Sequence, residues 1–407
     1  MGEQGYRKTT SDHCVFVQKF SDDDFVILLL YVDDILIVSR NVSRIDNLKK
    51  QLSKSFAMKD LGPAKRILGI KIERDRASKK LCMLQEQYIE KVLARFNMSK
   101  AKVVSSPLAS HFKLSSRHSP SIDKEKEDMR RVPYASTVGS LMYAMEVVKW
   151  IMRYLRGTSK LKLTFRGGKP ILVGYIDSDM AGDVDNRRST SDYLMTFSGG
   201  VVSWQSRLKK CVALSTIEAK YIAAAEACKE LLWMKCFMQE LGFKQQRYVV
   251  YCDNQSAIHL SKNSTYQARS KHIDVRYHWM RDALNDNFFE IEKIHTDNNG
   301  SDMLTKTLPM EKLGVCCFIA GMLLDTMVCY FGGMSLKLCY KLIIVDVALT
   351  MVIAGLTLLP SKLHFLTEVG LISNALLLCC IENQFFSPLE NQWQISIIKS
   401  PKCFLGD

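Results

Sequence analysis

The sequence lacks the cysteine patterns that indicate a zinc site. It contains 13 cysteines but no CxxC pair and no Cys/His spacing typical of zinc ligands. Six cysteines precede residue 311 and seven follow it, including the neighbours Cys316-Cys317 and Cys379-Cys380. No signal peptide follows Met1. We therefore expect free thiols and an intracellular protein, with the compartment unknown.

A clear membrane-spanning segment is also missing. Leu342 to Pro360 is apolar and almost long enough to span a bilayer, but Asp346 interrupts it, and Leu371 to Ile381 is too short. Residues 311–407 are therefore either a membrane anchor or translation past a usual stop into sequence never selected to fold. The internal acid, the scattered cysteines and the missing flanking charge favour a poorly folded, read-through tail without a membrane partner.

Positive charge, by contrast, is abundant and unevenly distributed. The formal net charge is +14, yet residues 311–407 hold six Lys or Arg against seven Asp or Glu, so residues 1–310 carry +15. A basic body favours a polyanionic partner, most commonly nucleic acid. A solvated basic surface without such a partner is the alternative.

Residues 1–165 combine apolar strands with basic helices. Phe25 to Val32 and Ile35 to Val38 are apolar runs on either side of Asp33-Asp34, which predicts a hairpin with an acidic tip. The other predicted elements are helices over Ile45 to Phe56 and Gln85 to Phe96, a strand over Ile67 to Glu73, and a loop over Ser105 to Arg131.

Residues 166–310 alternate regularly between strand and helix patterns. The predicted strands are Ile171 to Ile176, Tyr193 to Phe197, Val201 to Trp204, Cys211 to Ser215, Tyr248 to Cys252 and Ile291 to His295. The predicted helices are Ile217 to Leu241, closed by Gly242, then one ending near Leu260 and one over Asp302 to Leu308. This order predicts an α/β (α+β) fold with a mixed sheet.

Acidic residues occupy the positions where metal chemistry would be expected. Asp33 and Asp34 at a hairpin tip can hold Mg²⁺ against a nucleoside triphosphate, although an Asp-Asp turn is also common surface chemistry. Their strongly apolar flanks favour a buried sheet. A second set of acids could bind two Mg²⁺ ions, as phosphodiester hydrolysis requires, and consists of Asp177, Glu218, Asp253 and Asp302.

Several ordered motifs resemble one family. The run from Phe25 to Val38 is similar to the palm hairpin of copia-type (Ty1/copia) reverse transcriptases. Within that family the resemblance is greatest to plant Tnt-like elements. Further similar stretches follow in family order: Met58 to Gly62, Leu68 to Ile72, Val138 to Ala144 and Arg153 to Thr158. The resemblance covers roughly the first 320 residues and implies a truncated reverse transcriptase palm and connection over 1–165.

The resemblance also implies what the polymerase would need. In the family a third carboxylate lies upstream of the hairpin, and the chain begins too late to contain it. Met145 runs directly into Glu146, where the family has a longer segment, which indicates an internal deletion near 145/146. We therefore expect no independent polymerase activity.

The motifs Asp177 to Asp179, Ser215 to Ala219, Asp253 to Ala257 and Asp302 to Lys306 resemble the copia ribonuclease H domain, here placed over 166–310. The resemblance implies cleavage of RNA–DNA hybrids with Mg²⁺, or alternatively Mn²⁺, and association with the rest of the Pol polyprotein. The implied metal ligands are Asp33, Asp34, Asp177, Asp253 and Asp302.

One departure from the family concerns the metal site directly. The family helix carries two glutamates two residues apart, whereas this chain has Glu218 and Lys220. On a helix these two side chains lie on opposite flanks, so only one of them can face Asp177 and Asp253. We expect it to be Lys220, which cannot ligate Mg²⁺ and would repel it. Glu218 serving in its place is the alternative.

The remaining expectations concern one further departure from the family, two histidines and the basic residues around the acids. Asp192 stands where the family usually has Gly, and it would be strained if the position requires a positive φ. We expect His272 and His278 to make fold or backbone contacts. The residues predicted to contact nucleic-acid phosphates are Arg187, Arg188, Arg207, Lys209, Lys210, Arg269, Lys271 and Arg276.

Three hypotheses for the chain itself stay open at this point. It is a residual nuclease, a catalytically dead module that binds hybrid duplexes, or the product of a gene model without function. The ancestral activity that the resemblance implies is RNA-directed DNA synthesis coupled to removal of the RNA strand.

Overall fold

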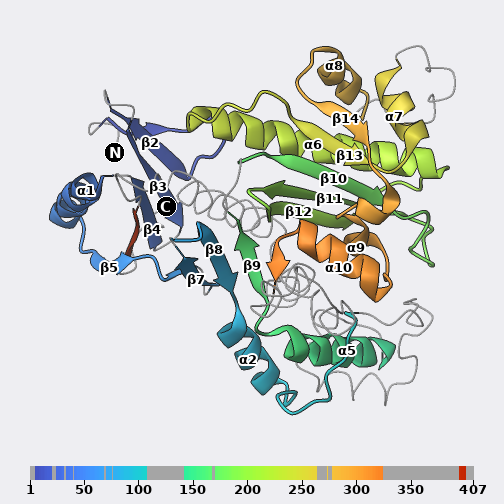
Figure 1. The fold of residues 1–407 in the computed structure, drawn as a ribbon, viewed down its shortest axis with the longest axis horizontal. Coiled ribbons are helices and arrows are strands. Elements are labelled where there is room, and N and C mark those ends of the chain that lie inside the picture. Colours follow the sequence, from blue (N-terminus) through green and yellow to red (C-terminus); the bar gives the residue numbers. More distant parts are fainter. Residues whose placement is uncertain are drawn as a thin grey trace.

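The computed structural model describes residues 5–20, 24–31, 34–39, 41–67, 70–75, 77–107, 142–166, 170–263, 273, 277–323 and 394–399. These residues form three sheets with helices packed around them (Figure 1). The mixed α/β architecture confirms the predicted fold class. The predicted divisions at 165/166 and 310/311 stay predictions.

The first sheet contains the predicted acidic hairpin. Its strands lie in the order β1 (Arg7–Lys8), β2 (Val15–Lys19), β3 (Phe25–Tyr31), β4 (Asp34–Ser39), β16 (Gln394–Lys399) and β5 (Lys59–Pro63). β3 and β4 are antiparallel, and Tyr31 pairs with Asp34. Both strands are almost fully buried because each face of the sheet contacts a different apolar cluster.

Helix α1 (Val42–Ser55) covers one face of this sheet, as the apolar stripe predicts. It begins at Asn41, whose side chain accepts a hydrogen bond from the Ser43 amide. Its buried residues Ile45, Leu48 and Leu52 pack with the β3–β4 hairpin.

The second sheet is antiparallel and draws strands from distant parts of the chain. Its order is β15 (Met322–Leu323), β9 (Lys162–Phe165), β8 (Lys80–Leu84), β7 (Ile70–Asp75) and β6 (Arg66–Ile67). The helices α2 (Glu86–Arg95) and α5 (Met142–Thr158) pack against each other beside it. α5 runs through the Met145–Glu146 junction as one helix.

The third sheet is mixed and carries the candidate site. Its order is β12 (Gly200–Leu208), β11 (Thr190–Phe197), β10 (Val173–Ser178), β13 (Val249–Cys252) and β14 (Glu290–Lys293). β12, β11 and β10 are antiparallel, whereas β10, β13 and β14 are parallel. The other elements of this part are α6 (Thr216–Glu240), α7 (Gln255–Lys262), α8 (Trp279–Asn285), a 3₁₀ turn (Thr296–Asn298), α9 (Asp302–Thr305) and α10 (Met310–Ile319). Helix α8 was not predicted.

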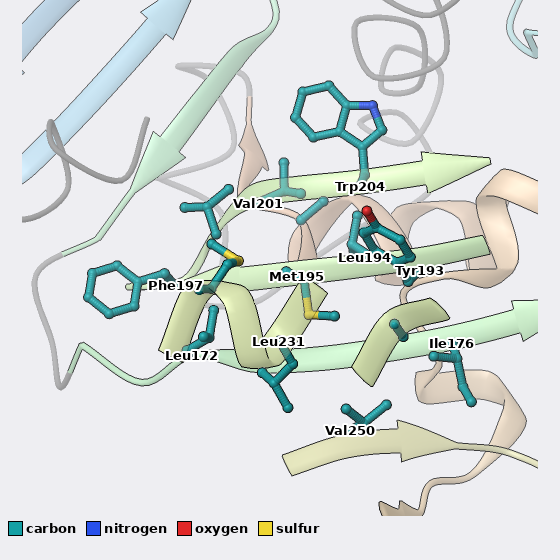
Figure 2. Packing of buried hydrophobic residues seen from close by; sticks show 14 of the residues in the cluster. Leu172, Ile176, Tyr193, Leu194, Met195, Phe197, Val201, Trp204, Leu231 and Val250 are labelled. Atoms are coloured by element: carbon teal, nitrogen blue, oxygen red, sulfur yellow. The ribbon is translucent and has the colours of Figure 1, made fainter. Parts of the chain in front are cut away.

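The long helix α6 crosses β10 and β11 and closes the core of this sheet. Figure 2 shows side chains from the strands, such as Met195 and Val250, gathered with Leu231 of α6. The helix begins at Ser215, whose side chain accepts a hydrogen bond from the Glu218 amide. It ends before Gly242, whose φ of +92° is accessible to glycine without strain.

The prediction of a strand over Cys211 to Ser215 is wrong. β12 ends at Leu208, and the following residues form bends that lead into α6. The Leu214 amide donates to the Glu218 carboxylate, and the Ala219 amide donates to the Ser215 carbonyl. These backbone groups therefore shape a helix entry instead of joining a strand ladder.

Candidate active site

The topology brings three of the predicted acids to one edge of the third sheet. Asp177 lies near the end of β10, and Asp253 directly follows its parallel neighbour β13. Asp302 begins α9, and the preceding Asn299 side chain donates to the Ile176 carbonyl at 2.9 Å. Carboxylate oxygens of Asp177, Asp253 and Asp302 lie within 4.8 Å of one another.

Lys220 of α6 lies among these acids. Its Nζ is 2.7 Å from Asp177 Oδ1 and also donates to Asp253 Oδ1. The side chain of Lys220 is 11% exposed, against 0% for Asp177 and 7% for Asp253. The three groups therefore form an ion cluster that is nearly closed to solvent.

Glu218 faces a different part of the chain. Its carboxylate Oε2 accepts a hydrogen bond from the Leu214 amide at 2.7 Å, and its amide donates to Ser215 Oγ at 3.1 Å. Ser215 thus caps the start of α6, and Glu218 also binds the amide of Leu214, the residue that precedes this cap. Glu218 thus stabilises the helix entry and is not part of the group formed by Asp177, Asp253 and Asp302.

Two further lysines reach the acids and were not singled out in the sequence. Lys306 Nζ is 3.2 Å from Asp177 Oδ2 and 3.4 Å from Asp302 Oδ2. Lys312 of α10 forms an ion pair with Asp302. The spacing of Lys306 four residues after Asp302 was a signal that could have found it. Lys312 lies on a separate helix, so no local spacing indicated it.

These contacts change the proton affinities of the cluster. Burial alone would raise the pKa of Asp177, but the charge of Lys220 and hydrogen bonds from Lys220 and Thr305 outweigh burial and lower it to about 2. Burial opposes the charged form of Lys220, but Asp177 and Asp253 outweigh it and raise the pKa of the ammonium. Burial and the nearby Asp177 charge raise the pKa of Asp302 despite its lysine partners.

The three carboxylates form a possible donor set for a divalent ion. Three converging carboxylates are the oxygen ligands that Mg²⁺ prefers. However, the Lys220 ammonium hydrogen-bonds both Asp177 and Asp253, and so lies where an ion bridging these two acids would have to bind. An ammonium has no lone pair to offer a metal and repels a cation. As arranged, these residues do not fit a pair of divalent ions.

Asp192 is a buried acid beside this cluster. It pairs directly with Asp177 across β10 and β11, is 1% exposed, and neither carboxyl oxygen has a hydrogen-bond partner. Burial first, and then the charges of Asp177 and Asp179, raise its pKa well above the ordinary value. Asp192 lies in a strand and is not among the described residues with positive φ. The backbone strain considered for this position therefore does not arise.

The acidic hairpin of the first sheet is described only in part. Asp34 begins β4 and is half-buried, whereas Asp33 lies outside the described residues. Within the described part of the chain, Asp34 does not belong to a group of three possible metal ligands. The β3–β4 hairpin, which was predicted to carry a polymerase site, is therefore present as a scaffold, and the described residues place no cluster of acids on it.

The predicted phosphate-contacting residues differ in exposure. Arg187 and Lys210 are exposed on the connections that flank β11 and β12, Arg207 is exposed near the end of β12, and Arg188 is half-buried. Lys209 is buried, its Nζ donates to Ser178 Oγ and to the Ala219 carbonyl, and burial lowers its pKa to about 8. Lys209 is therefore a core contact and not part of the basic surface, which corrects the expectation for this residue.

The remaining predicted basic residues, Arg269, Lys271 and Arg276, lie outside the described residues, as does His272. His278 Nδ1 is 3.1 Å from the hydroxyl of Tyr221 on α6, a contact that stabilises the fold. Among the helices that the structure describes, none combines the length and the apolar character needed to cross a bilayer.

A mixed sheet with acids at the ends of adjacent parallel strands, together with a separate sheet that contains an apolar hairpin, defines an α/β protein with a candidate acidic active site. The family model for "Reverse transcriptase (RNA-dependent DNA polymerase)" matches residues 1–110. The chain belongs to the copia-type retrotransposon Pol polyprotein family.

Two curated relatives support this membership. The Pol polyprotein from transposon TNT 1-94 of Nicotiana tabacum is 56% identical over 348 residues, which cover 79% of this chain and 26% of that protein. The Pol polyprotein from transposon RE1 of Arabidopsis thaliana is 32% identical over 331 residues, covering 75% and 22% respectively. The chain thus spans about a quarter of the length of these relatives.

Among solved structures, the chain is similar to the N-terminal ribonuclease H domain of rv2228c from Mycobacterium tuberculosis, fused to maltose binding protein. It is 12% identical, with a TM-score of 0.24, and the match covers 34% of this chain and 91% of that one. The fold described above therefore rests on its own strand order and not on this similarity.

Proposed function

We propose that residues 166–310 are a ribonuclease H domain that retains a nucleic-acid-binding surface but cleaves the RNA of an RNA–DNA hybrid slowly or not at all. The observation that carries this proposal is the Lys220 ammonium between Asp177 and Asp253. The ancestral activity that we propose is RNA-directed DNA synthesis with removal of the RNA strand.

The chemistry of phosphodiester hydrolysis explains why this lysine matters. The reaction requires a group that activates water and a Lewis acid that stabilises the leaving oxygen, tasks that bound divalent ions normally perform. The Lys220 ammonium supplies one positive charge, but because its pKa is raised it stays protonated and cannot act as a base. Asp177 is fully engaged with Lys220, Thr305 and Lys306.

The binding part of the proposal rests on charge. Residues 1–310 carry a net charge of +15, and Arg187, Arg207 and Lys210 are exposed near the candidate site. Contacts of this kind bind phosphates without reading sequence, and they weaken steeply as salt is raised. The expected partner is an RNA–DNA hybrid or another nucleic acid.

The decisive experiment replaces Lys220 by glutamate in the full chain. A labelled RNA–DNA hybrid is incubated with the wild-type chain and Lys220→Glu, each with Mg²⁺, Mn²⁺ or chelator. We expect metal-dependent cleavage to rise by at least about tenfold, because one oxyanion ligand replaces one cation in the metal site. Lys229→Glu is the matched control, since Lys229 lies on the same helix with its side chain 50% exposed. The control is expected to match the wild type.

Two results would contradict this proposal. Equal cleavage by the wild type and Lys220→Glu would mean that Lys220 does not block the site, as the alternative with Glu218 requires. Binding of the wild type to the hybrid that does not weaken between low and moderate salt would exclude the basic surface as the binding site.

The polymerase part is proposed to be inactive in this chain. A two-metal polymerase needs a third carboxylate beside Asp33 and Asp34, and no such acid accompanies Asp34 among the described residues. Primer extension on an RNA template should give no product above background with Mg²⁺ or Mn²⁺. Extension that is lost in Asp34→Asn would contradict this expectation.

A further inference from the structure

The strand β16 completes the first sheet from a distant part of the sequence. Residues 394–399 lie between β4 and β5, although the preceding described residue is Leu323 (Figure 1). β16 pairs antiparallel with β4 from Gln394 opposite Ser39 to Lys399 opposite Asp34. On its other side it pairs with β5, with an irregular register. β4 and β5 do not pair with each other, so they form a slot that one strand fills.

Both faces of this slot are apolar. Ile397 is 6% exposed and packs in the same cluster as Leu36 and Val38. Ile398 is 1% exposed and packs in the opposite cluster with Ile35 and Ile37. The slot therefore accepts an extended segment with apolar residues on both faces. The backbone amides and carbonyls of that segment complete one hydrogen-bond ladder with β4 and one with β5.

An empty slot would be costly. Without β16, β4 would expose an unpaired edge over its whole length, next to buried isoleucine, leucine and valine side chains. Open, apolar sheet edges bind strands from other chains. The same chain carries both the slot and the strand that fits it, so donor and acceptor surfaces are complementary between any two copies.

We propose that the slot between β4 and β5 is a strand-acceptor site and that a second copy of this chain supplies its β16, which yields strand-exchanged dimers. The contacts that β16 makes in the slot are the same whether the strand comes from the same copy or from the other. In the sequence, residues 324–393 lie between the strand and Leu323, the preceding described residue. The balance is then set by protein concentration during folding.

The test uses two full-length copies with different affinity tags. They are unfolded and refolded together, or refolded separately and then mixed, over a range of concentrations. Capture on one tag and detection of the other, with light scattering for mass, measures exchange. We expect mixed dimers after joint refolding, in a fraction that rises with concentration, and far fewer after late mixing.

Variants and a peptide locate the contact. Ile398→Lys places an ammonium at a buried position and should reduce the mixed dimer by about tenfold or more. Leu61→Lys is the matched control, since Leu61 lies on β5 but is 47% exposed, and it should leave exchange unchanged. A peptide of residues 391–401 added during refolding should lower the wild-type dimer, and the same peptide with Ile398→Lys should not.

Each remaining result overturns the proposal. A chain that stays monomeric at every concentration has no strand exchange. A dimer that persists equally in Ile398→Lys, or that the wild-type peptide does not reduce, forms through another surface. Because the peptide competition uses the wild-type chain, it decides the question even if Ile398→Lys fails to fold.

Discussion

Replacing Lys220 by methionine is expected to destabilise the third sheet, because it removes the ammonium that lies between two acids. In the native protein Lys220 Nζ bridges Asp177, which is fully buried, and Asp253, whose side chain is 7% exposed. Methionine has a similar length and apolar stem but no charge. The variant therefore removes the ion pair and changes the packing volume little.

The size of the effect follows from the contacts. Removing one partner of a buried ion pair costs about 3–5 kcal/mol. A fall of the Asp177 pKa from 3.8 to about 2 corresponds to roughly 2–3 kcal/mol. Since Asp177 can take up a proton in the variant, and Lys306 stays at 3.2 Å, we expect a loss of about 2–3 kcal/mol. For a domain of about 150–250 residues, this loss in the free energy of unfolding lowers Tm by roughly 4–12 °C.

The assay is urea unfolding followed by circular dichroism, at several pH values. A carboxyl whose folded pKa is depressed stabilises the protein above its unfolded pKa and loses that effect as pH falls through the folded pKa. The difference between wild type and Lys220→Met should therefore be largest above pH 3.8 and shrink towards pH of about 2. Lys229→Met is the control and should cost under about 0.5 kcal/mol, because Lys229 is exposed. A loss below about 1 kcal/mol, or one that does not change with pH, would refute the reasoning.

Three further predictions concern neighbouring residues. Asp192→Asn should stabilise the protein at neutral pH and be neutral at low pH, because a carboxyl with a raised folded pKa costs stability above its unfolded pKa; equal unfolding midpoints at pH 7 would contradict this. Ser215→Ala should cost about 1 kcal/mol in urea unfolding by removing the cap of α6, and no loss would show that Glu218 alone holds the helix start. The double variant Arg207→Gln and Lys210→Gln should weaken hybrid binding and flatten its salt dependence in filter binding or anisotropy; an unchanged slope would place the contacts elsewhere.

The sequence by itself determined the elements and the neighbourhood of the acids. Alternation and apolar runs predicted the β3–β4 hairpin, and helical periodicity closed by Gly242 predicted α6, whereas the cap at Ser215 became apparent only in the structure. These features are local, because hydrogen bonding and side-chain direction repeat with a fixed period along the chain. The convergence of Asp177 and Asp253 also followed, since both stand at the ends of strands that proved to be parallel neighbours.

Tertiary structure alone decided which side chain reaches those acids. The choice between Glu218 and Lys220 depends on how α6 is rotated against β10 and β11, and that rotation is fixed by packing along the whole helix. Lys209 sits in the core and Lys312 joins Asp302 from a separate helix, because through-space contacts bring together residues that no sequence spacing relates. The filling of the first sheet by residues 394–399 is likewise a long-range pairing, and an apolar six-residue segment by itself does not specify its partner.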